Sequence, residues 1–128
     1  MIGYVTLGTK DADAAKTFYD ALLGLLGAKR MMDMGTFTLW GTGFDKPGLA
    51  ITSPNNGEPA TYGNGTMVAL SAAGRADVHA LHAKALELGG TCEGPPGLRG
   101  VEGPTAFYAS YFRDLDGNKL CAYRMGPA

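Results

Sequence analysis

Residues 108–123 read YASYFRDLDGNKLCAY, and this stretch decides the fold. An arm rich in aromatic residues and a short apolar arm flank the sequence Asp116-Gly117-Asn118. Asp-Gly is typical of tight hairpin turns, because glycine adopts the positive φ that such turns require. The stretch therefore predicts two antiparallel strands that close a sheet, with Gly117 at the turn.

Upstream of this hairpin, one pattern of elements occurs twice. An alternating strand (residues 2–9) and an amphipathic helix (12–26) precede three short strands within residues 29–53. A second alternating strand (66–72) and helix (76–88) precede a strand from Thr91, a loop over residues 95–104 and the closing hairpin. A shift of 63 residues places YVTL of residues 4–7 on MVAL of residues 67–70. A duplicated βαβββ module explains this agreement.

The repeat predicts an α+β fold in a single domain, residues 1–128. Module one covers about residues 1–53, a polar linker covers 54–65, and module two covers about 66–128. We expect the tandem βαβββ modules to form a curved, roughly eight-stranded mixed sheet around a central cavity, with the helices outside.

Composition narrows the functional classes. The net charge is −1 without a basic cluster, which argues against nucleic acid and anionic membranes as partners. Apolar residues make up 45% of the chain, but no run approaches the roughly 20 residues of a membrane span. The strand pattern begins at the N-terminus, so we expect no signal peptide. Cys92 and Cys121 are too few for a disulfide framework, so we expect reduced thiols and a cytoplasmic protein.

The closing hairpin resembles that of the glyoxalase/bleomycin resistance/extradiol dioxygenase (vicinal oxygen chelate) superfamily. The usual form there is Asp-Pro-Asp-Gly-Asn, two further residues and a metal-binding Glu. In this chain Leu115 replaces the Pro, and Cys121 stands where the Glu would be. The resemblance covers nearly the whole chain and implies the same tandem-module architecture.

The resemblance also implies four metal-ligand positions, one on the first and one on the last strand of each module. These positions are Tyr4, Ala50, Met67 and Cys121, with one residue of uncertainty at Ala50. Alanine has no donor, and thioether or un-ionised phenol groups are poor ligands for hard divalent ions. We therefore expect no metal and no other cofactor. If the register were shifted by one residue, Asp33 and Glu93 would be the acids able to serve.

Candidate cavity residues follow from strand alternation. Cys121 and Tyr123 alternate with Leu120 and Ala122, which predicts that the first pair faces the cavity. The binding candidates are Tyr4, Trp40, Met67, Tyr108, Cys121, Tyr123 and Arg99. Arg99 could hold a carboxylate or phosphate. The alternative for the aromatic candidates is that they simply fill the interior of a small curved sheet. The alternative for Arg99 is an ordinary solvated position on the surface. We assign no catalytic residue, and we expect the two histidines, His79 and His82, to lie on the outer helix.

These observations favour a protein that binds or transforms a small, largely apolar molecule in its central cavity, without the usual family metal site. One alternative is a metal-dependent lyase, isomerase or dioxygenase with a displaced ligand set. Another is a non-catalytic, drug-sequestering binder similar to the bleomycin-resistance proteins. The resemblance also implies a homodimer, because related proteins build their pockets from paired modules.

Overall fold

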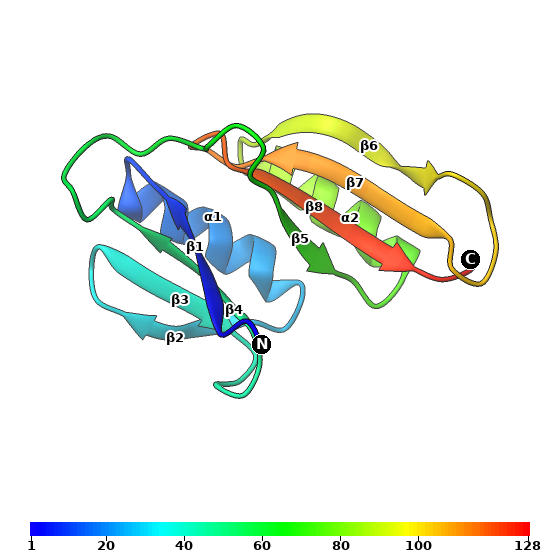
Figure 1. Ribbon diagram of the computed structural model, residues 1–128, viewed down its shortest axis with the longest axis horizontal. Helices are drawn as coiled ribbons and strands as arrows, with labels where there is room; N and C mark the ends of the chain where they lie inside the picture. The colour runs from blue at the N-terminus through cyan, green and yellow to red at the C-terminus, as the bar shows by residue number, and fades with distance from the viewer. The chain divides into compact units, whose positions relative to one another are not determined.

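The computed structural model describes all residues from Met1 to Ala128. The chain forms two compact units, shown in Figure 1. The first contains Met1–Asn64 and the turn Leu115–Asn118, and the second contains Gly65–Asp114 and Lys119–Ala128. Each has a single helix and a four-stranded mixed sheet, so the predicted tandem βαβββ modules are confirmed. The eight strands are hydrogen-bonded as two sheets of four and form no closed barrel.

The first unit contains β1 (Tyr4–Gly8), α1 (Ala12–Gly24), β2 (Lys29–Asp33), β3 (Phe37–Gly41) and β4 (Gly48–Thr52). Its strand order is β1-β4-β3-β2, with β1 parallel to β4 and the other pairs antiparallel. The second unit contains β5 (Val68–Ser71), α2 (Arg75–Glu87), β6 (Thr91–Arg99), β7 (Phe107–Arg113) and β8 (Lys119–Met125). Its order, β5-β8-β7-β6, repeats the topology of the first unit. Neither helix is long and apolar enough to cross a membrane.

Helix α1 begins and ends where its sequence indicates. The Asp11 side chain caps it by accepting a hydrogen bond from the Ala14 amide at 3.1 Å. At the other end Gly27 has φ +76°, and the Ala28 amide donates to the Leu23 carbonyl at 3.1 Å. The helix buries apolar side chains against the first sheet: Ala15, Phe18, Tyr19, Leu22 and Leu23. Helix α2 similarly buries Val78, Leu81, His82 and Ala85.

Strand β6 differs from the prediction. The sequence indicated a loop from residue 95 to 104, but β6 continues through Pro95 and Pro96 to Arg99. Because β6 is the outer strand of its sheet, a proline that lacks an amide proton costs little there. Register shifts on both sides of Gly94 absorb the irregularity.

The hairpin turn adopts the expected conformation and packs within the first unit. Gly117 has φ +85°. The Asp116 carboxylate accepts a hydrogen bond from the Lys10 amide at 2.8 Å. The buried Asn118 amide donates to the Gly8 carbonyl at 2.9 Å. These bonds satisfy backbone groups at the junction of β1 and α1, which gives the Asp-Gly-Asn sequence a structural role.

Candidate functional site

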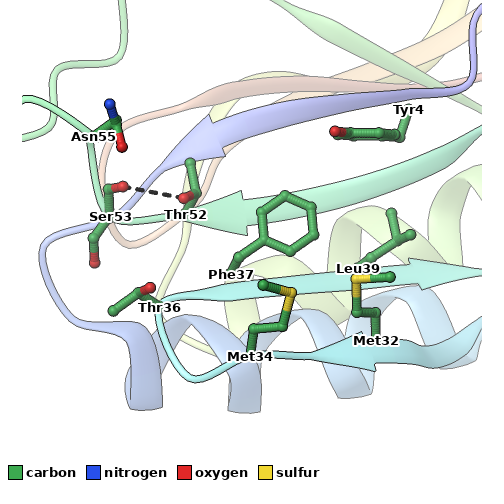
Figure 2. A pocket seen from close by; sticks show the side chains of 9 residues that line it. All are labelled: Tyr4, Met32, Met34, Thr36, Phe37, Leu39, Thr52, Ser53 and Asn55. Carbon is green, nitrogen blue, oxygen red and sulfur yellow. Dashed lines mark hydrogen bonds between the residues drawn. The ribbon is translucent and has the colours of Figure 1, made fainter.

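The first sheet has one face covered by α1, and we call its opposite side the first open face. A hollow of about 520 Å³ lies on it. Figure 2 shows its lining residues: Tyr4, Met32, Met34, Thr36, Phe37, Leu39, Thr52, Ser53 and Asn55. The rings of Tyr4 and Phe37 meet edge-on, with centroids 5.8 Å apart. Tyr4, Met32 and Met34 are exposed together on this face, and an exposed apolar patch is typical of a surface that meets a ligand or a partner.

The second sheet also has an open face, on the side away from α2. Cys121 lies there between Tyr111 on β7 and Ala69 on β5. The adjacent ring pair, Phe107 and Tyr123, has centroids 5.5 Å apart. We call this side the second open face.

The Cys121 thiol is a poor candidate nucleophile. Only 1% of the residue is exposed. Burial raises the pKa of the Cys121 thiol, although hydrogen bonding with Tyr111 and the positive charges of Arg99 and Lys119 lower it in part. Since the thiolate is the reactive form, this environment suppresses reactivity at neutral pH.

The structure separates the predicted cavity residues into two groups. Tyr4 lines the hollow of the first unit, and Met67 is partly exposed immediately before β5. Alternation along β8 places Cys121 and Tyr123 together on the second open face. Arg99 lies at the end of β6, with its guanidinium 5.5 Å from the centre of the Tyr111 ring on that face.

Two predicted wall residues lie on the helix-covered sides instead. Trp40 is 1% exposed, packs against Tyr19 of α1 and donates from Nε1 to the Asp20 carboxylate at 2.8 Å. The Tyr108 hydroxyl contacts His79 Nε2 of α2 at 2.6 Å. Each belongs to the opposite side of its strand from the open-face residues, so neither lines the hollow or the second open face.

The binding candidates chosen from the sequence did not include several residues of the open faces: Met32, Met34, Phe37, Leu39, Tyr111 and Lys119. Alternation contained a usable signal for two of them. Phe37 stands three residues before Trp40, and Tyr111 three residues after Tyr108. An odd separation in a regular strand puts two side chains on opposite faces. The sequence alone could therefore have shown that the two members of each pair do not share a wall.

Charged groups on the helix-covered sides form structural networks. Arg30 donates to both carboxylate oxygens of Asp20, at 2.9 and 2.7 Å. This bond is the main reason why the pKa of Asp20 lies below its ordinary value. His82 Nε2 lies 3.3 Å from Cys92 Sγ, and burial lowers the pKa of His82. The histidines thus lie at the outer helix, as predicted.

A protein with two βαβββ modules, one helix to each mixed sheet and an open face opposite the helix, belongs to the tandem-module α+β class. A family model, the Glyoxalase/Bleomycin resistance protein/Dioxygenase superfamily, matches residues 1–122. The chain belongs to this superfamily.

Solved structures agree. A glyoxalase/bleomycin resistance protein from Albidiferax ferrireducens T118 is 39% identical, with a TM-score of 0.85 over 97% of this chain and 98% of its own. A glyoxalase-related enzyme from Fulvimarina pelagi (18% identity, TM-score 0.73, 97% and 87% covered) shares the fold. Lactoylglutathione lyase from Agrobacterium tumefaciens also shares the fold, with 22% identity and a TM-score of 0.65 over 97% of this chain and 92% of its own. No functionally curated protein sequence matches the chain significantly.

The residues present do not fit the superfamily's divalent metal. Thr6 pairs with Ala50 in the first unit as Ala69 pairs with Cys121 in the second, so Ala50 is the counterpart of Cys121. The four ligand positions therefore carry phenol, methyl, thioether and buried thiol groups, a set without a hard donor. No group of three or more His, Cys, Asp or Glu side chains is placed to hold a metal ion.

The two acids considered as substitutes have other partners. Asp33 pairs with Lys16 at 3.1 Å and with Arg30 at 3.0 Å. Glu93 pairs with Arg113 at 2.7 Å. A shift of register by one residue therefore supplies no free carboxylate to a metal.

Proposed function

We propose that this protein binds a small, largely apolar molecule on the open face of its first sheet, without the metal centre usual in its superfamily. The hollow of about 520 Å³ is the observation that carries the proposal. Its volume is in the range of small-molecule sites, which are typically apolar with a few polar groups that fix orientation. Tyr4, Phe37 and Leu39 supply rigid apolar surface. Met32 and Met34 add flexible thioether chains that adapt to different shapes.

The polar groups of the hollow favour binding over catalysis. They are hydroxyls and one amide, on Thr36, Thr52, Ser53 and Asn55, and Tyr4 adds a phenol. Such groups orient a ligand by hydrogen bonds. General acid–base catalysis at neutral pH needs a group whose pKa lies near 7, and the lining contains no histidine, carboxylate, amine or thiol.

The test uses a neutral aromatic probe, benzyl alcohol, titrated into the protein and followed by backbone amide NMR shifts. We expect saturable shifts at residues of the hollow. Met34→Glu should weaken them, because a ligand that covers the new carboxylate must remove water from it, which costs free energy. Val101→Glu is the matched control, since Val101 is another exposed apolar residue but lies in the loop after β6. Shifts that do not saturate, or equal effects of both variants, would contradict the proposal.

Metal content provides a second test. Protein purified without chelator should contain well under one equivalent of nickel, zinc, iron or manganese by elemental analysis. Stoichiometric metal that is lost on Tyr4→Phe or Cys121→Ala substitution would show that these positions bind metal after all and would contradict the proposal.

A further inference from the structure

Two cations lie on a single tyrosine ring of the second open face. Arg99, at the end of β6, has its guanidinium carbon 5.5 Å from the centroid of Tyr111. Lys119, at the start of β8, has Nζ at the same 5.5 Å. All three residues are half-buried. Cation–π attraction stabilises each contact and leaves N–H donors for a ligand on Lys119 and, apart from one Nη2–H bonded to the backbone, on Arg99.

The backbone of β6 is shaped around the Arg99 side chain. Nη2 donates to the Pro95 carbonyl at 2.7 Å. A Cβ at Gly97 would lie 3.0 Å from Nη1, and one at Gly94 would lie 3.3 Å from Nη2 and 3.0 Å from the Tyr111 ring. The two glycines therefore leave the space in which the guanidinium lies over the strand. This arrangement distinguishes Arg99 from a freely solvated surface arginine.

Neither cation has a carboxylate partner. Arg30, Arg75 and Arg113, by contrast, each pair with an acid at 2.6–2.7 Å. Glu93, the acid on β6, pairs with Arg113, and the nearby charge of Lys119 also helps to lower the pKa of Glu93. Two half-buried positive charges without a salt bridge of their own are the type of feature that an anionic ligand complements.

The surface beside the cations is apolar. The ring pair of Phe107 and Tyr123 lies along the same face, next to the small side chains of Ala109 and Cys121. Both small side chains are buried, so the aromatic rings supply the apolar surface beside the cations.

We propose that Arg99 and Lys119, flanking Tyr111, form a binding site for the anionic oxygen group of a small aromatic molecule, either a carboxylate or a phosphate ester. We call this site the Arg99–Lys119 clamp. The clamp shares with the proposed function the assumption that the ligand is a small molecule. It does not depend on the hollow, because all of its residues belong to the second sheet.

The test titrates benzoate, phenyl phosphate and benzyl alcohol separately and follows the backbone amide shifts. Benzoate or phenyl phosphate should shift amides of β6–β8 saturably, and the tighter of the two identifies the preferred anion. The dissociation constant should rise about tenfold in Arg99→Gln and in Lys119→Gln, because each removes one charge-assisted interaction. Lys84→Gln, on α2, is the matched control and should change nothing.

Gly97→Ala tests the positioning of Arg99 without removing its charge. The added methyl group should displace the guanidinium and weaken anion binding in an otherwise folded protein. Equal binding of benzoate and benzyl alcohol at β6–β8, or full affinity in Arg99→Gln, would overturn the clamp. Failure of benzyl alcohol to shift the hollow of the first sheet would contradict the proposed function instead, so the two outcomes are distinguishable.

Discussion

The two cysteines of this chain lie in opposite environments. Cys92 is exposed on the outer strand β6, beside His82. Cys121 is buried, and burial raises the pKa of its thiol. We predict that a small thiol reagent labels Cys92 quickly and Cys121 slowly in the native protein, since burial blocks access to Cys121 and reduces its thiolate fraction. The single variants Cys92→Ser and Cys121→Ser assign the two phases by mass spectrometry. Equal labelling rates would contradict the buried position of Cys121.

His82 gives the protein a pH-dependent stability. Burial and the neighbouring His79 lower the pKa of His82 below its ordinary 6.5. Below pH 6.5 the unfolded chain therefore binds a proton that the folded chain does not. The free energy of unfolding consequently decreases as the pH is lowered. For one proton the slope is at most about 1.4 kcal/mol per pH unit. The carboxylates with lowered pKa values change the stability only near and below about pH 4.5, where they become protonated. Their contribution is therefore separated in pH from that of His82.

The measurement is urea unfolding of the wild type and His82→Gln at pH 7.5 and 5.5. We expect the wild type to lose more free energy of unfolding between these pH values than the variant. The comparison within each protein cancels the packing cost of the substitution. An equal loss in both proteins would show that another group is responsible.

Residue orientation was only partly predictable from the sequence. Alternation correctly separated Cys121 and Tyr123 from Leu120 and Ala122, because β8 is regular over its whole length. It could not say which side of an isolated strand meets a helix. That depends on tertiary partners such as Asp20, whose carboxylate accepts the Trp40 hydrogen bond. Trp40 therefore looked like a cavity wall in the sequence, although it stabilises the junction of α1 and β3.

At the scale of elements, the end of α2 has no space for a side chain. A Cβ at Gly90 would lie 2.5 Å from the Arg113 carbonyl oxygen and 2.8 Å from the Ala85 carbonyl oxygen. We predict that Gly90→Ala destabilises the protein by about 1–3 kcal/mol, because backbone atoms must move. Gly24→Ala, at the end of α1, is the matched control. Nothing lies within 4 Å of its added methyl group, so it should be neutral or stabilise by up to about 1 kcal/mol. Urea unfolding measures the loss of stability in each variant. An equal loss in Gly90→Ala and Gly24→Ala would show that Gly90 is not crowded.

Elements with strong local signals were predictable, and one with mixed signals was not. The two helices were placed correctly to within about two residues, because their apolar residues recur at helical spacing and each is followed by glycine; α1 also has an Asp11 cap. The sequence prediction ended strand β6 at Pro95, because proline is normally excluded from a central strand. That β6 is an outer strand depends on the tertiary fold, which the local sequence pattern does not reveal.

At the scale of the whole molecule, the fold was predictable and the function was not. The repeated YVTL/MVAL landmark and the closing hairpin specify two modules independently of any chemistry. The superfamily's chemistry depends on four side chains, and at those positions this chain has Tyr4, Ala50, Met67 and Cys121. Features that could replace a metal site, such as the hollow and the Arg99–Lys119 clamp, are assembled from several strands. Spacing along a single strand does not reveal them.

The outer strands of the two sheets differ in their protection. Strand β2 has the sequence KRMMD, and β6 contains Pro95 and Pro96, devices that discourage pairing with another chain. Strands β1 (YVTLG) and β5 (VALS) carry no charge and no proline. We propose that a second copy of the chain covers this apolar surface in a two-fold homodimer.

Light scattering at micromolar concentration should therefore give twice the chain mass of 13.3 kDa. Thr6→Lys places a charge on the exposed side of β1 and costs the isolated chain little, because Thr6 is exposed within it. This variant should shift the mass towards the monomer. Thr105→Lys, an exposed loop position between β6 and β7, should remain dimeric. A monomeric wild type, or a Thr6→Lys dimer as stable as the control, would show that β1 does not take part in assembly.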